Sequence, residues 1–278
     1  SARPATQWTT WGDGLRNAAA LRNPLLPASA AADDTQLSSG SDLTACCLCS
    51  HPKLPLYLAG GDGIVQCWQF GHSIQGRGLQ DHLRAQYRLP SGGRAAELKF
   101  SPCGEQFGCI EAAGSLCLWR FQSGTDSIPL PFCRLQCHGK RGADLCFVGT
   151  SVVVATVGLS AGVAAPSLCL WDVLLPPSQA LITSCAAHSE GGCCVLHSPS
   201  DMSLVSGGQK GEMAIFDLRQ QRQRAQWSAH SLATRSLALD ASTGLCFSAS
   251  SDGDIKLWDL ACSRAADAPG PCGSTDDL

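Results

Sequence analysis

Apolar and polar residues alternate along short runs of this chain, and turn residues bound each run. Alternation with a period of two predicts β-strands that bury one face. One order recurs, a turn followed by an alternating strand that ends in an aromatic residue, in the segments GGDGIVQCWQF, AAGSLCLWRF, APSLCLWDV, QKGEMAIFDL and SSDGDIKLWDL. The aromatic positions are Trp68, Trp119, Trp171, Phe216 and Trp258, spaced by 51, 52, 45 and 42 residues.

Further strands precede each of these segments. A strand rich in small residues comes directly before, with the sequences LYLAGG, QFGCIEA, VVVATVG, SLVSGG and CFSASS. Another apolar strand comes before that, for example AELKFSP or RSLALD. With one more strand after the aromatic position, each repeat predicts a four-stranded unit, and the chain contains five of them.

One uncharged stretch, residues 145–171, has the hydropathy of a membrane span. Gly149, Gly158, Gly162 and Pro166 interrupt it, and the apolar pieces between them have the length of strands. We therefore expect strands separated by a loop here, and no transmembrane segment.

The repeats resemble those of WD40 β-propellers, and the last repeat matches most specifically. His230, Ser248, Asp252 and Trp258 occupy the places of that family's buried hydrogen-bond tetrad. The resemblance implies that the serine hydroxyl joins the imidazole to the indole N–H, while the aspartate fixes the imidazole tautomer. It predicts an all-β propeller with about five four-stranded blades. Since the family usually has six or seven blades, we expect an incomplete ring with exposed edge strands.

Parts of the tetrad recur in earlier repeats. His188 and Ser206 form one partial copy, which Phe216 interrupts because it cannot donate a hydrogen bond, and His138 with Trp171 suggests another. A Ser/His/Asp set also invites a catalytic interpretation, but its repetition from blade to blade favours a structural role. The sequence contains no phosphate-binding loop, nucleophile elbow or dinucleotide fingerprint, so we expect neither enzymatic activity nor a cofactor.

Composition and charge argue against two other classes of protein, nucleic-acid binders and zinc-binding proteins. The 278 residues carry 20 Lys and Arg against 23 Asp and Glu, for a net charge of -3. A nucleic-acid binder usually has a basic excess, so no nucleic-acid partner is expected. The 17 cysteines are spread along strand-like runs, and Cys46-x-x-Cys49 lacks the second ligand pair of a zinc site. We expect buried reduced thiols in a cytoplasmic protein, and no metal site.

A narrower resemblance extends over about residues 42–260. The segments HPKLPLYLAGGDG, LKFSPCGEQFG, CRLQCHGKRGADLCFV, SLCLWDVLLPPSQALI and SGGQKGEMAIFDLRQ are similar to the C-terminal propeller of the DmX-like/rabconnectin-3 family. That resemblance implies a non-catalytic scaffold, part of a regulator of vacuolar-type proton ATPase assembly (the role of the RAVE complex) and of organelle acidification. A generic WD40 adaptor, such as a substrate receptor of a ubiquitin ligase, is the alternative. An enzyme on a propeller scaffold is the third hypothesis, and it lacks convergent acid–base pairs.

The expected partners are other proteins, namely proton-pump subunits or assembly factors. A possible binding rim contains Arg77, Arg84, Lys140 and Arg141. The basic cluster RQQRQR at 219–224 admits contact with anionic lipid, hence peripheral association with endosomal, vacuolar or vesicle membranes, or a plain solvated turn.

The two ends of the chain differ from the repeats in composition. Residues 1–41 predict an irregular extension in which Trp8 and Trp11 pack on the first blade. Residues 42–260 predict the propeller blades. Residues 261–278 have no periodicity and predict a disordered tail.

Overall fold

The computed structural model describes residues 44–70, 81–121, 129–149, 152–162, 165–260 and 271–274. The chain divides into two units, Ser1–Ala45 and Cys46–Leu278, and every described strand belongs to the second. The extension predicted for residues 1–41, with Trp8 and Trp11, lies outside the described residues.

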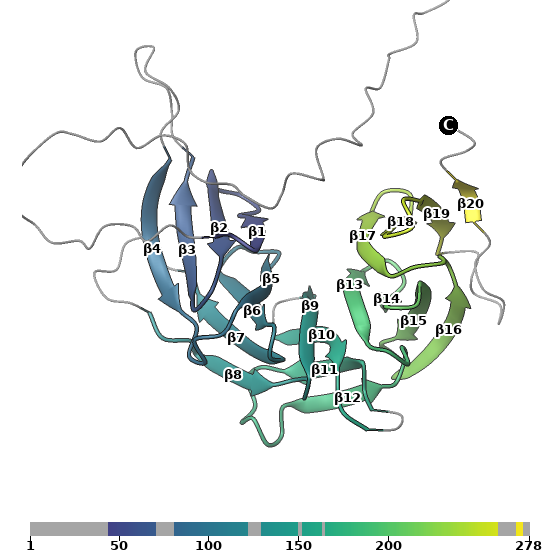
Figure 1. The fold of residues 1–278 in the computed structure, drawn as a ribbon, viewed down its shortest axis with the longest axis horizontal. Helices are drawn as coiled ribbons and strands as arrows, with labels where there is room; N and C mark the ends of the chain where they lie inside the picture. The colour runs from purple at the N-terminus through teal and green to yellow at the C-terminus, as the bar shows by residue number, and fades with distance from the viewer. Residues whose placement is uncertain are drawn as a thin grey trace, which may run out of the picture. The chain divides into compact units, whose positions relative to one another are not determined.

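The second unit consists of antiparallel four-stranded sheets that follow one another along the chain (Figure 1). The first sheet contains β1 (Cys47–Ser50), β2 (Leu56–Gly60), β3 (Ile64–Gln69) and β4 (His82–Arg88). The second contains β5 (Ala95–Phe100), β6 (Gln106–Glu111), β7 (Ser115–Arg120) and β8 (Cys133–Gln136). The third contains β9 (Arg141–Val148), β10 (Val153–Leu159), β11 (Leu168–Asp172) and β12 (Leu181–Cys185). The fourth contains β13 (Gly192–Ser198), β14 (Ser203–Gly208), β15 (Glu212–Asp217) and β16 (Arg222–Ser228). The fifth contains β17 (Thr234–Asp240), β18 (Leu245–Ser250), β19 (Ile255–Asp259) and β20 (Pro271–Ser274).

Each sheet is a meander in which sequence neighbours pair. Short turns join many of the paired strands, and several of these turns need a glycine at positive φ. Gly114 and Gly211 are the clearest cases, with φ of 90° and 78°. A Cβ on either glycine would collide with the backbone carbonyl of a histidine, His138 or His230, that leads into the next sheet. These hairpins therefore fix the entry of the following sheet as well as the turn itself.

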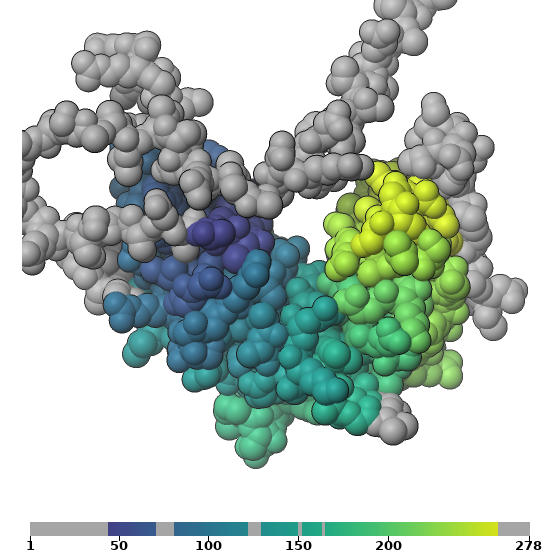
Figure 2. All heavy atoms as spheres, viewed as in Figure 1, coloured from purple at the N-terminus to yellow at the C-terminus, as the bar shows by residue number. Residues whose placement is uncertain are grey.

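The core is a series of layers between successive sheets, because alternate residues of each strand face opposite neighbours. One buried cluster joins the first sheet to the second, and others join the second to the third, the third to the fourth and the fourth to the fifth. The first strands of the sheets also pack in sequence, β1 on β5, β5 on β9, β9 on β13 and β13 on β17. Figure 2 shows the same succession in space-filling form, coloured in chain order.

Within the described residues, the buried clusters join each sheet only to its neighbour in sequence, and none joins the first sheet to the fifth. This confirms the predicted fold class, an all-β incomplete propeller with five four-stranded blades. Residues 145–171, the stretch with the hydropathy of a span, lie in strands β9, β10 and β11 and their connections. None of the described residues belongs to a helix with the length and apolarity needed to cross a membrane.

The chain end differs from its prediction at four residues. Pro271–Ser274, expected within a disordered tail, form β20 and pair with β19 through Lys256, Leu257 and Trp258. The physical reason is that a meander leaves the outer edge of β19 open, and backbone pairing there does not require an apolar sequence pattern. Residues 261–270 and 275–278 lie outside the described residues.

Candidate functional site

The fifth blade brings its four predicted tetrad residues together. His230 Nε2 lies 2.7 Å from Ser248 Oγ, and Trp258 Nε1 donates to the same oxygen at 2.8 Å. Asp252 Oδ2 lies 3.5 Å from His230 Nδ1. His230, Ser248 and Trp258 are buried, at 4%, 0% and 3% exposure. The hydroxyl thus joins two rings that would otherwise carry unpaired polar atoms in the core.

Local structure places each member of this tetrad. Ser248 lies on β18 and Trp258 on β19, one strand apart, while His230 precedes β17. The backbone N–H of His230 donates to Gly211 O of the previous blade at 2.9 Å. Because that bond crosses between blades, the tetrad locks the incoming chain to both the fourth and the fifth blade.

The electrostatics of the tetrad favour a neutral imidazole beside a charged carboxylate. Burial lowers the pKa of His230, and the charge of Asp252 only partly offsets it. Burial also opposes the charged form of Asp252, but hydrogen bonds from the N–H groups of Asp254 and Ser231 outweigh burial and lower its pKa. The carboxylate is held in place by the 3.0 Å bond from Ser231 N.

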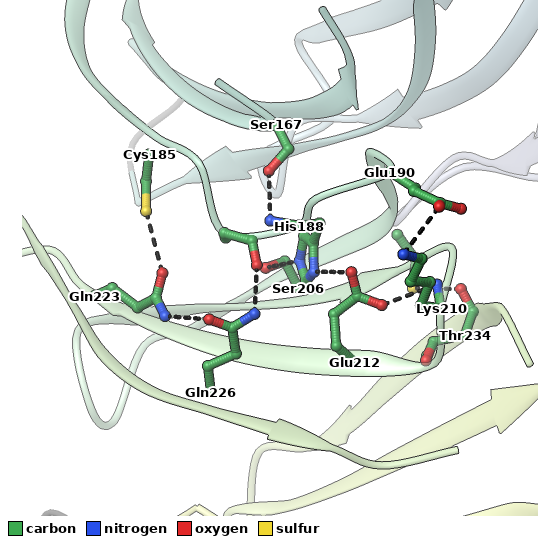
Figure 3. A network of polar contacts seen from close by, with 12 residues as sticks. Ser167, Cys185, His188, Glu190, Ser206, Lys210, Glu212, Gln223, Gln226 and Thr234 are labelled. Carbon is green, nitrogen blue, oxygen red and sulfur yellow. Dashed lines mark hydrogen bonds and ion pairs between the residues drawn. The ribbon is translucent and has the colours of Figure 1, made fainter. Parts of the chain in front are cut away.

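The fourth blade contains a variant of the same network (Figure 3). His188 Nε2 lies 2.8 Å from Ser206 Oγ, and the backbone N–H of His188 donates to Ser167 Oγ at 2.8 Å. Glu212 Oε1 lies 3.6 Å from His188 Nδ1 and takes the role of the aspartate. Glu212 was not predicted from the sequence, because it lies four residues before Phe216 whereas Asp252 lies six before Trp258. Phe216 is buried at the end of the network, where it offers no donor.

The third blade has a threonine in place of the serine. His138 Nε2 lies 3.1 Å from Thr156 Oγ1, and Trp171 Nε1 donates to that oxygen at 3.0 Å. Burial lowers the pKa of His138 to about 4. Thr156 was missed, although its place in VVVATVG matches that of Ser206 in SLVSGG, where comparison of the repeats would have found it.

These networks do not suit acid–base catalysis. A general base works best with a pKa near the operating pH and within reach of a substrate. His138 and His230 are almost fully buried, and burial lowers the pKa of both imidazoles. Each histidine Nε2 is already engaged by a core hydroxyl. The arrangement stabilises blades, and it offers no accessible nucleophile.

The described cysteines are free thiols, and most are buried. Burial raises the pKa of Cys67 to about 11 and that of Cys117 to about 12, which disfavours the reactive thiolate. In the Cys46-x-x-Cys49 pair, burial also raises the pKa of Cys49. These thiols pack as small apolar side chains.

One group of possible metal ligands occurs among the described residues, formed by His230, Asp252 and Asp254. The imidazole already contacts Ser248 and Asp252, and the Asp252 carboxylate accepts from Ser231 and from Asp254 N. The tetrad and its turn therefore account for this group.

The predicted rim residues come from different parts of the unit. Arg84 lies exposed on β4, where its Nε donates to Gln69 Oε1 at 2.6 Å. Lys140 is exposed directly before β9, and Arg141 is the half-buried first residue of β9, with its guanidinium facing the Gln209 amide. Arg77 lies outside the described residues. Exposed cationic side chains thus occur both on β4, the last strand of its sheet, and beside β9, the first strand of its sheet.

A cavity of about 400 Å³ lies along the first strands of the second to fifth blades. Lys99, Asp144, Cys193, His197 and Arg235 are among its lining residues. Asp144 accepts from Val195 N at 2.9 Å and lies 3.8 Å from Lys99 Nζ. Burial raises the pKa of Asp144 to about 7, against the opposing charge of Lys99. This carboxylate was not predicted from the sequence, because its role depends on contacts with Val195 and Lys99, which lie on other strands.

The sheet topology and the repeated His–hydroxyl networks together define the class of protein to which the chain belongs. The chain is a WD40-repeat protein, an incomplete β-propeller, and the family described as "WD domain, G-beta repeat" matches residues 221–259, which include β16 to β19. It is similar to DmX-like protein 1 of mouse, with 35% identity over 216 residues, or 76% of this chain. DmX-like protein 1 of human is 34% identical over the same share of the chain. The chain spans 7% of the length of these relatives.

Proposed function

We propose that this chain is a non-catalytic protein-interaction scaffold, part of a regulator of vacuolar-type proton ATPase assembly and organelle acidification. The observation that carries the proposal is the length of the similarity. Identity of 35% over 216 residues extends far beyond residues 221–259, the part of the chain that matches the general WD40 repeat. Such a match includes surface segments between the blades, where partner contacts usually lie.

The side-chain chemistry supports binding over turnover. His138, His188 and His230 each contact a core hydroxyl of their own blade, so these polar groups are used within the blades. Charged side chains are left at the surface, including Arg84 and Lys140. On this proposal the chain works in the cytoplasm, and contacts proton-pump subunits or assembly factors at the surface of acidic organelles.

Affinity capture from cells tests the proposal. The tagged full-length protein is compared with a form carrying Arg84→Glu and Lys140→Glu, and with a control carrying Lys53→Glu. Lys53 is also exposed, so the control reverses a surface charge outside the predicted rim. We expect proton-pump subunits to be captured by the wild type and the control, and to be depleted at least several-fold in the double variant.

One outcome would contradict the proposal, and a second would correct only the binding surface assigned to it. Capture of ubiquitin-ligase subunits without proton-pump subunits would favour the generic adaptor. Equal capture of the pump by all three forms would exclude Arg84 and Lys140 from the binding surface, although the pump association itself would stand.

A further inference from the structure

The first and fifth sheets each have one face that packs on no other sheet among the described residues. The other face of each belongs to a buried cluster, shared with the second and the fourth sheet respectively. Large apolar side chains remain exposed on both free faces, among them Leu48, Leu83, Phe247 and Ile255. Exposed apolar patches of this kind mark interaction surfaces.

Every packed junction in the unit has two different halves. At the junction of the fourth and fifth sheets, the fourth contributes the aliphatic residues Val205, Met213 and Ile215. The fifth contributes its aromatic position, Trp258, with Cys246 beside it. The junction of the first two sheets repeats this on the inner strands of each sheet, with Leu58 and Val65 opposite Phe107 and Trp119, while Tyr87 of β4 adds an aromatic ring to the first sheet's half. We call the half on the earlier sheet, such as that with Val205 and Met213, the leading face. We call the half on the later sheet, which contains the aromatic position, the following face.

The free face of the fifth sheet is a leading face. Ser206 and Ser248 are equivalent, because each hydroxyl bonds the histidine of its own blade. Phe247, the residue before Ser248, therefore corresponds to Val205, the residue before Ser206. Both lie on the face of their strand opposite to the serine. The aromatic positions Phe216 and Trp258 likewise align Ile255 with Met213. Val205 and Met213 have 0% exposure, whereas Phe247 and Ile255 are 41% and 49% exposed.

The free face of the first sheet is a following face. Trp68 occupies the aromatic position and pairs with Tyr57, as Trp119 pairs with Phe107 in the second sheet. Trp119 is fully buried, but Trp68 is only half-buried. Leu83 pairs with Trp68 on the next strand and is 41% exposed, and Leu48 on β1 is 52% exposed.

We propose that the leading face of the fifth sheet in one copy of the chain packs on the following face of the first sheet in a second copy. The contact continues the series of junctions that already holds the blades together. A single copy carries both halves, and they differ from each other, so each copy supplies what the other lacks. Such a contact is heterologous, and head-to-tail pairing leads to closed rings or to open chains.

The test is the mass of the full chain in solution, measured by light scattering or sedimentation over a range of concentrations. The wild type is expected to increase in mean mass as its concentration rises. Ile255→Glu blocks the leading face, and Leu48→Glu blocks the following face, with Leu83→Glu as a second variant of that face. Leu174→Glu is the matched control, since Leu174 is 71% exposed but lies after β11, away from both faces.

Mixing the two blocked variants gives the sharpest result. Alone, Ile255→Glu and Leu48→Glu should each remain monomeric, while Leu174→Glu associates like the wild type. When Ile255→Glu and Leu48→Glu are mixed in equal amounts, the two variants should form a dimer and nothing larger, because each variant keeps one intact face. Circular dichroism and thermal melts identify any variant that fails to fold.

Three outcomes would overturn the proposal. The wild type could stay monomeric at every concentration, which would mean that something other than a second copy covers these faces. The folded blocked variants could associate as well as the wild type. The variants could also each lose association without regaining it on mixing, which would indicate a symmetric contact in which each copy uses both faces at once.

Discussion

At the scale of single residues, the third, fourth and fifth blades each contain one buried hydroxyl that bonds a histidine. The stability of the blade depends on this hydroxyl. Ser248 accepts from Trp258 Nε1 and contacts His230 Nε2, so the loss of either ring leaves a polar atom unpaired in the core. The same logic holds for Thr156 between His138 and Trp171. In the fourth blade, Phe216 offers no donor, and among the described residues Ser206 Oγ bonds only the imidazole of His188.

Trp258→Phe tests this interpretation. The substitution keeps a buried aromatic ring but removes the N–H that bonds Ser248, so the free energy of unfolding should fall by about 1–3 kcal/mol. Urea denaturation provides the measurement. Trp227→Phe is the control, because the Trp227 indole packs against Trp258 but its N–H bonds no described atom. An equal loss in the two variants would show that ring packing, and not the hydrogen bond, accounts for the effect.

Asp144 predicts a dependence of stability on pH. Its pKa is raised from 3.8 to about 7 in the folded protein, chiefly by burial, so the folded state binds a proton more tightly than the unfolded state. Its contribution to stability is therefore greatest at low pH and decreases as the pH rises from about 4 to about 7. In Asp144→Asn that decrease should disappear. Thermal melts of both proteins across this range measure it, and parallel curves would contradict the assignment.

Two of the residues that the sequence did not predict, Glu212 and Thr156, were missed for the same reason. Glu212 and Thr156 play the parts of Asp252 and Ser248 with a different spacing or a different side chain. One tetrad taken as a template cannot predict such substitutions, because several side chains satisfy the same buried nitrogen or hydroxyl. Asp144 was missed because its role depends on a contact with Val195, 51 residues away.

At the scale of elements, the alternation of apolar residues was sufficient to predict most strands. The segments SLVSGG and CFSASS correspond to β14 and β18, and the aromatic segments to the strands that follow them. β20 could not be predicted in this way. Pro271–Ser274 contain no apolar alternation, and their strand conformation depends on pairing with β19.

The hairpin glycines give a prediction at this scale. Gly211 and Gly244 have similar φ values, 78° and 75°, but a Cβ at Gly211 collides with the His230 carbonyl while one at Gly244 meets nothing within 4 Å. Gly244→Ala should cost about 1–2 kcal/mol from the left-handed backbone alone. Gly211→Ala should cost clearly more, because the next blade must also shift. Chemical denaturation of both variants separates the cost of the backbone conformation from the cost of the collision. Equal losses in the free energy of unfolding would show that the collision has no consequence.

At the scale of the whole molecule, the described blades form a series of similar junctions that ends on two unlike free faces. Apolar layers join neighbouring sheets, and tetrads tie the entry of a blade to the blade before it. This construction leaves charged side chains such as Arg84 and Lys140 at the surface. Repetition made the blades predictable from sequence, but no repeat specifies a partner, so the proton-pump partner remains part of the proposed function.

The most direct test of the proposed role is the lumenal pH of acidic organelles in cells that lack the protein and any redundant paralogue. We expect a raised lumenal pH in these cells, and we expect the wild type and the Lys53→Glu control to restore the normal value. The variant with Arg84→Glu and Lys140→Glu should fold but fail to restore it. Normal acidification in cells without the protein would contradict the account and favour a WD40 adaptor unconnected with the proton pump.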